Sequence, residues 1–377
     1  MQFKKYPFER LNELLEGVTP NSNYSPISLT IGEPQFDTPQ FIKDAMCNSI
    51  DLLNKYPKSA GEEKLKEAQL GYLKRNFDLD LNLSQIIPTF GTREVLFNFP
   101  QFYLSDKEAP KMAFVNPFYQ IYEGASIASG AKVVYLELKK ENNFLPQIDR
   151  DKLKDVNLVI LNTPSNPTAS VMSMEDLKEW VKLALEFDFV LVNDECYIDL
   201  YLDKPIPSLL NASIEVGNSE FKNILVLNSI SKRSSAPGLR SGFIAGDSTI
   251  LKDYMRYRTY VGAAIPLPLQ MGAVVAWNDD TAPAKFREIY KQNLQIASDI
   301  LKTPIPKATF YIWLEVQNAT KAAKELYKEY NVKVLPGEFL GREKAGVDYW
   351  RLALVYDNKT TKEALNRVAK FLGEFNG

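Results

Sequence analysis

The chain has 377 residues, of which 45% are hydrophobic, so it can bury a large core and is too long for one compact unit. Its 45 basic and 47 acidic residues are well mixed and leave a net charge of -2, which excludes a basic face for nucleic acid or anionic membranes. Histidine is absent and only Cys47 and Cys196 occur, which excludes histidine triads, a disulfide framework and an ordinary zinc site. We expect a cytoplasmic, two-domain protein without signal peptide, membrane span or metal, acting on small molecules.

Short apolar runs alternate with amphipathic segments through most of the chain. A helix is predicted at 174–187, after Ser173 as a candidate N-cap. Its apolar residues Leu177, Val181 and Ala184 fall on one face. Strands that alternate with helices predict an α/β fold with a mostly parallel sheet covered on both faces. The predicted strands of this sheet are 111–115, 157–161, 189–193, 223–227 and 242–245.

The last part of the chain has a different pattern. Strands are predicted at 308–314 and 349–354, and helices near 320–330 and 362–372. This mixture predicts a smaller α+β domain that shares an extensive interface with the first. We place the large domain at 43–290 and the small domain at 1–42 together with 291–377.

Thr92 and Arg93 lie in a Gly-Thr-Arg-Glu turn that follows the apolar run 86–90 and opens a predicted helix. The free amides and the positive end of the helix dipole at such a turn can bind a phosphate. An ordinary helix start is the alternative for this short motif.

Asp194 follows a predicted buried strand, at the edge of the sheet where ligands of α/β proteins bind. Its carboxylate could pair with a protonated ring nitrogen, and Tyr197 could hydrogen-bond a ring oxygen. Asn166 follows another buried strand and could contact the same oxygen. The alternatives are a helix N-cap for Asp194 and a plain Asn-Pro turn at Asn166.

Lys232 ends an apolar run, and its neighbours predict a pyridoxal phosphate (PLP) site. A lysine forms a Schiff base with this aldehyde only when its amine is unprotonated, which burial and nearby cations favour. Ser229, Ser231 and Arg240 could add donors to the phosphate, the arginine through a charge-assisted fork. Tyr119, after another strand, is a candidate to stack on the cofactor ring, with ordinary packing as the alternative.

Arg351 lies in an otherwise apolar strand, next to Trp350. A buried arginine needs an anionic partner. The α-carboxylate of a substrate would satisfy it through two hydrogen bonds, and a structural ion pair is the alternative. Gly32, in an Ile-Gly-Glu-Pro turn, could let the backbone approach the same carboxylate, which Asn166 could also contact.

These motifs together resemble the class I and II aminotransferases of PLP fold type I. The resemblance extends from Gly32 to Arg351, and its most specific part is Ser-x-Ser-Lys at 229–232 followed by Arg240. It implies a large domain with a mostly parallel, seven-stranded sheet between helices and a smaller α+β domain. It also implies that Lys232 bonds PLP and then moves a proton between the substrate α-carbon and the cofactor, so that no histidine is needed.

The resemblance also has an implication for the oligomeric state. Tyr56, in Asn-Lys-Tyr-Pro, matches the family's tyrosine that contacts the phosphate of the neighbouring subunit's cofactor. This match implies a homodimer with shared active sites. The chain departs from the family at Ala169, where glycine usually follows Asn-Pro-Thr, and at 263–268, which lacks small polar residues.

Within the family, the segments 31–36, 55–60, 116–124 and 231–240 are most similar to N-succinyldiaminopimelate aminotransferases of lysine and peptidoglycan biosynthesis. This similarity implies transamination between N-succinyl-LL-2,6-diaminopimelate and 2-oxoglutarate or, in reverse, glutamate. The candidates to bind the distal or succinyl carboxylate are Arg75, Arg233 and Arg258.

Three alternatives share the fold. An aminotransferase for aspartate, alanine or aromatic amino acids would have the same catalytic residues. A PLP β-lyase would also keep the lysine but would eliminate a side-chain group. A regulator built on this fold would carry a DNA-binding module, and no segment before the motifs has the length or basic charge for one.

Overall fold

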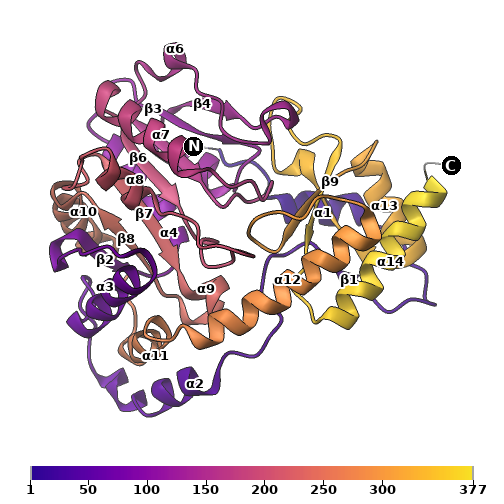
Figure 1. Ribbon diagram of the computed structural model, residues 1–377, viewed down its shortest axis with the longest axis horizontal. Helices are drawn as coiled ribbons and strands as arrows, with labels where there is room; N and C mark the ends of the chain where they lie inside the picture. The colour runs from indigo at the N-terminus through magenta and orange to yellow at the C-terminus, as the bar shows by residue number, and fades with distance from the viewer. Residues whose placement is uncertain (1, 376–377) are drawn as a thin grey trace.

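The computed structural model describes residues 2–375, which form three sheets surrounded by helices (Figure 1). The largest sheet has seven strands. In spatial order they are β2 (Ile86–Thr89), β8 (Gly242–Gly246), β7 (Ile224–Ser229), β6 (Val190–Asp194), β5 (Leu158–Asn162), β3 (Lys111–Asn116) and β4 (Lys132–Glu137).

The sheet is mostly parallel, as predicted. Strands β7, β6, β5, β3 and β4 run in one direction, and only β8 is antiparallel to both of its neighbours, β7 and β2. All five predicted strands are confirmed, with ends that differ by one or two residues. Every residue of β5, β6 and β7 is buried, which explains why these strands are continuous apolar runs in the sequence.

Helices cover both faces of this sheet because successive side chains of each strand point to opposite sides. Leu191 belongs to the core on one side, and Val190 and Val192 belong to the core on the other. The first core is covered by α2 (Gln40–Cys47), α3 (Glu63–Phe77), α7 (Met174–Phe187), α8 (Leu209–Glu215) and α11 (Leu267–Trp277). The second is covered by α4 (Thr92–Leu104), α5 (Ile121–Ser129) and α10 (Ser248–Val261).

The helix predicted at 174–187 is confirmed as α7. The Ser173 hydroxyl accepts a hydrogen bond from the amide of Asp176, and the Asp176 carboxylate accepts one from the amide of Ser173. This reciprocal pair satisfies two donors that would otherwise be free at the helix start.

The two smaller sheets and their helices pack around a second hydrophobic core. One contains β11 (Leu335–Pro336), β12 (Tyr349–Ala353) and β9 (Tyr311–Glu315), all antiparallel. The other pairs β1 (Ile27–Ser28) with β10 (Val332–Lys333), so the N-terminal segment lies beside the C-terminal part of the chain. Their helices are α1 (Pro7–Leu15), α13 (Ala319–Tyr330) and α14 (Asn358–Phe375).

Helix α12 (Thr281–Leu301) runs from near α11, which covers the large sheet, to the small sheets (Figure 1). The domain boundary predicted at residue 290 falls inside this helix, and the division itself remains a prediction. No helix among residues 2–375 is long and apolar enough to cross a membrane. The remaining short elements are α6 (Arg150–Leu153), α9 (Ile230–Arg233), η1 (Ile50–Asn54), η2 (Leu83–Gln85), η3 (Lys140–Asn142), η4 (Pro237–Leu239) and η5 (Gly337–Phe339).

Candidate active site

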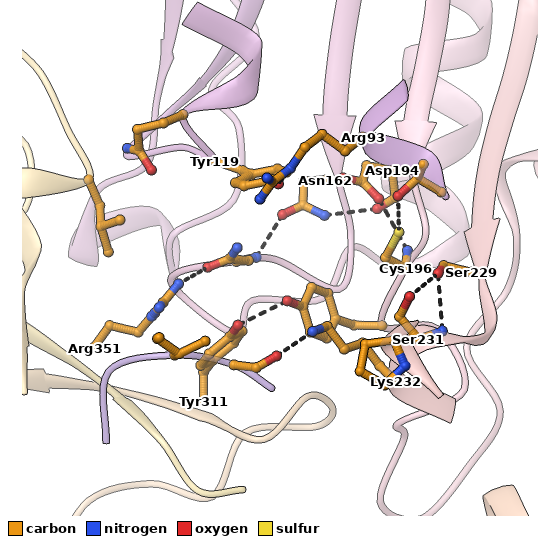
Figure 2. A pocket seen from close by; sticks show the side chains of 18 of the residues that line it. Arg93, Tyr119, Asn162, Asp194, Cys196, Ser229, Ser231, Lys232, Tyr311 and Arg351 are labelled. Atoms are coloured by element: carbon orange, nitrogen blue, oxygen red, sulfur yellow. Dashed lines mark hydrogen bonds between the residues drawn. The ribbon is translucent and has the colours of Figure 1, made fainter. Parts of the chain in front are cut away.

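A cavity of about 420 Å³ lies where the carboxyl ends of β5, β6 and β7 face residues of the small sheets (Figure 2). The register of the sheet explains this position, because Asn162 is paired with Asp194, and Ser229 ends the next strand. Of the residues predicted to bind the cofactor or the substrate α-carboxylate, all but one line the cavity: Gly32, Thr92, Arg93, Tyr119, Asn166, Asp194, Tyr197, Ser229, Ser231, Lys232, Arg240 and Arg351.

Tyr56 is the exception. Its side chain is 100% exposed and lies outside the cavity of its own chain. Its predicted contact with a neighbouring subunit therefore stays a prediction.

Lys232 lies on α9, the short helix that follows β7. Ser229 caps this helix by accepting a hydrogen bond of 3.1 Å from the amide of Ser231, which fixes the direction in which Lys232 leaves the strand. The Lys232 ammonium donates to the carbonyl of Gly32, across the cavity. Burial lowers the pKa of Lys232 to about 8, because the charged amine is kept from water.

Asp194 ends β6 and is only 4% exposed. Its carboxylate accepts hydrogen bonds from the Tyr122 hydroxyl at 2.9 Å and from the amide of Cys196 at 3.3 Å. Asn162 donates to the Asp194 carbonyl at 2.8 Å and so ties β5 to the same corner. Burial raises the pKa of Asp194, and bonds from Cys196 and Tyr122 offset part of that rise. A cationic partner would hold this buried carboxylate ionised.

The turn before α4 provides a cradle for an anion. Gly91 has a φ of 73°, a conformation that strains larger residues, and a Cβ added to it would lie 2.2 Å from Arg240 Nη2 and displace that guanidinium. Arg240 donates to the carbonyl of Pro237 at 2.7 Å and retains further N–H groups. Thr92 and the paired hydroxyls of Ser229 and Ser231, 2.9 Å apart, line the same end of the cavity.

Arg351 of β12 is 4% exposed and donates to the Asn166 side chain at 2.7 Å and to the Thr30 carbonyl. Within residues 2–375 no carboxylate lies within ion-pair distance of it, and its Nε has no hydrogen-bond partner. The guanidinium also lies 4.6 Å from the ring centre of Tyr311. Within the described residues Arg351 therefore forms no structural ion pair.

Asn166 is followed by a tight turn that contains Ala169. Ala169 has a φ of 58°, the left-handed conformation that the family's usual glycine adopts without strain. The amide of Ala169 donates to the carbonyl of Ser165 at 3.0 Å, so the turn closes in spite of the alanine.

The three arginines predicted to bind a distal carboxylate do not line the cavity, so this prediction is wrong for the site of their own chain. Arg258 is buried and forms a two-bond pair with Glu94, at 2.7 and 2.9 Å. The partner acids of Arg233 and Arg75 are recognisable only in the folded chain: Arg233 pairs with Asp199 and Asp280, and Arg75 with Asp280.

Several residues of the site were missed. Tyr311 shares a hydrogen bond of 2.9 Å with the Tyr197 hydroxyl, and a Cβ on Gly32 would lie 1.9 Å from the Tyr311 hydroxyl oxygen. Tyr122 supports Asp194, as described above. Tyr6 and Phe8 bring the N-terminal segment to the cavity wall. Tyr122 lies in the first turn of α5, and Tyr119 precedes that helix, so no helical spacing pointed to Tyr122.

The arrangement fits a phosphorylated, cationic aldehyde. At one end of the cavity an arginine, hydroxyl groups and a helix start can bind a phosphate. The buried Asp194 can pair with a cation, and Lys232 has an amine with a lowered pKa that can react with an aldehyde. In residues 2–375 no group of three or more cysteine, aspartate and glutamate side chains is arranged to hold a metal ion.

Comparisons with known proteins agree with this geometry. The family model "Aminotransferase class I and II" matches residues 24–368. The crystal structure of aminotransferase AspB from Helicobacter pylori 26695 is 49% identical, with a TM-score of 0.97 over 99% of this chain and 100% of that one.

Two curated relatives are also similar over most of their length. An aspartate aminotransferase from Pyrococcus abyssi is 30% identical over 92% of both chains. An LL-diaminopimelate aminotransferase from Nitratidesulfovibrio vulgaris is 27% identical over 91% of both. The protein therefore belongs to the class I and II aminotransferases and is a PLP-dependent transaminase.

Proposed function

We propose that this aminotransferase exchanges an amino group between N-succinyl-LL-2,6-diaminopimelate and 2-oxoglutarate or glutamate. The observation that carries the proposal is Arg351, a buried cation that lines the cavity without an acid partner in the described chain. An α-carboxylate would complete its hydrogen bonds in a water-poor site. Asn166 and Gly32 would hold the substrate beside it.

The other residues have distinct roles in this proposal. Arg240, Ser229, Ser231 and the amides of the turn at 91–93 would hold the cofactor phosphate, and Asp194 would hold the proton on its ring nitrogen. Tyr197 and Asn166 would orient the ring oxygen, with Tyr119 against the ring. When bound, PLP supplies an electron sink for the substrate α-carbon.

Lys232 would move the proton at the substrate α-carbon. Its lowered pKa means that the amine is partly neutral near pH 8 and can accept a proton there. A lysine that binds the cofactor and moves protons makes histidine unnecessary, which is consistent with a chain that has none.

The choice of substrate is supported by the cavity wall and by a relative. Apolar Pro7, Phe8, Ile31, Leu335 and Leu340 line the side of the cavity formed by the N-terminal segment and the small sheet. Such a wall suits the methylene chain of a long diamino acid. A relative is named as an LL-diaminopimelate aminotransferase, which acts on the same carbon skeleton by its name.

The experiment is a substrate panel on the purified enzyme loaded with PLP. The proposal expects the succinylated donor and glutamate to convert the cofactor to its amine form, and Lys232→Ala to abolish turnover. Conversion by aspartate, alanine or aromatic amino acids but not by the succinylated donor would establish the broader aminotransferase instead. Release of pyruvate from an added cysteine-like substrate, without the amine form, would establish the β-lyase.

A cytoplasmic homodimer completes the proposal. Exposed apolar residues precede Tyr56 along the chain and occur again at the end of α10, as expected for a surface covered by a second copy. They are Ile50, Leu53, Tyr56, Tyr260 and Val261. We also keep the division into a large domain at 43–290 and a small domain at 1–42 and 291–377 as part of the proposal.

A further inference from the structure

The charges that line the cavity do not balance. Arg93, Lys232, Arg240 and Arg351 provide four cationic side chains, and Asp194 is the one carboxylate among the described lining residues. In the proposed function the phosphate dianion is held by Arg240 together with hydroxyl groups and the amides of the helix start, the α-carboxylate pairs with Arg351, and Lys232 works as a neutral amine. The Arg93 side chain then has no assigned anion.

No acid of the described chain forms an ion pair with Arg93. The nearest acid in sequence, Glu94, is bound by Arg258 through both carboxylate oxygens and also accepts a bond of 2.9 Å from the amide of Phe90. Within residues 2–375, Arg93 has no carboxylate at ion-pair distance.

Tyr119 holds the Arg93 side chain in place. The Nε of Arg93 donates to the Tyr119 hydroxyl at 2.7 Å, and the guanidinium carbon lies 5.7 Å from the centre of that ring. Figure 2 shows the guanidinium lying over Tyr119, which would stack on the cofactor ring. Because the tether uses Nε, the two terminal nitrogens of the fork are left for a ligand.

We propose that Arg93 binds the second carboxylate of dicarboxylic substrates and so selects them over monocarboxylic amino acids. The inference rests on the proposed function, since it assigns the α-carboxylate to Arg351. A fixed guanidinium fork matches a carboxylate in two hydrogen bonds, while a monocarboxylic side chain would leave the fork unpaired. Aspartate, glutamate, 2-oxoglutarate and a succinylated diamino acid all carry such a group.

The test uses Arg93→Gln, which keeps hydrogen-bonding groups but removes the charge. The ratio of kcat/KM for a dicarboxylic donor to that for alanine should fall about 30-fold, as expected for loss of a charge-assisted pair. Arg150→Gln is the matched control, because Arg150 is an exposed arginine on α6 outside the cavity, and it should keep the ratio. Arg93→Lys, which keeps the charge without the fork, should restore part of it.

Calorimetry supplies a readout without turnover. The PLP-loaded enzyme should bind glutarate more tightly than valerate, its monocarboxylic counterpart, and Arg93→Gln should remove about 30-fold of that preference. An unchanged preference, or an equal loss for both ligands, would overturn the inference. So would weaker PLP binding with unchanged selectivity, because Arg93 would then serve the phosphate.

The two proposals fail separately. If no donor is transaminated by the loaded enzyme, the proposed function is wrong whatever the calorimetry reports. If donors are transaminated and Arg93→Gln keeps the preference for dicarboxylates, only the role of Arg93 is wrong.

Discussion

Replacing Arg351 by glutamine tests the residue that is proposed to bind the α-carboxylate of every amino donor. Arg351 is 4% exposed and uses two of its five N–H groups on Asn166 and Thr30, which leaves three for a ligand. Two charge-assisted hydrogen bonds to a carboxylate at about 1.5 kcal/mol each amount to about 3 kcal/mol. This corresponds to a loss of about 100-fold in kcat/KM for every amino donor.

The assay is steady-state kinetics with glutamate and with the best donor of the panel. A raised KM with a largely retained kcat is expected, because the interaction is present before the chemical step. Arg351→Lys should recover only part of the loss, since an ammonium cannot make the paired contact. Thermal unfolding of both variants checks that the contacts to Asn166 and Thr30 have not been lost with the fold. An unchanged KM in a folded Arg351→Gln enzyme would refute the reasoning and return Arg351 to a structural role.

Three further predictions follow from the geometry and the charges. Formaldehyde and borohydride should methylate Lys232 in the apoenzyme, and the extent of methylation should rise with pH through a midpoint near 8. Burial lowers the pKa of Lys232 from 10.5 to about 8, so the amine is protonated and unreactive below pH 8 and neutral above it. Mass spectrometry measures this, and a midpoint near 10.5 would contradict the effect of burial. Asp194→Ala should weaken PLP binding about 100-fold in an absorption titration, because about 3 kcal/mol of buried ion pairing is lost; equal affinity would exclude the ring-nitrogen role. Arg258→Gln should lower the free energy of unfolding in urea by about 3 kcal/mol, because Glu94 is left buried and unpaired. A stable variant with altered dicarboxylate preference would instead place Arg258 in substrate binding.

The sequence alone was sufficient for the parts of the site that are local to one element. Strands β5 to β7 are buried on both faces, so they could be read as apolar runs, and the residues that follow them had to lie at one edge of the sheet. That is why Asn166, Asp194 and Lys232 were predicted together. The left-handed turn at Ala169 was beyond this kind of argument.

The tertiary structure decided everything that depends on pairs distant in sequence. Arg233 and Arg258 looked available for a substrate, yet folding brings Asp199, Asp280 and Glu94 to them, and a buried charge must be paired. Tyr311 became part of the site for the same reason, since β9 places it against Tyr197, 114 residues away. Periodicity and motifs encode which residues end a strand or cap a helix, because those depend on neighbours a few positions away. Which arginine is left without an acid partner, and so can bind a ligand, depends on contacts that form only in the folded chain.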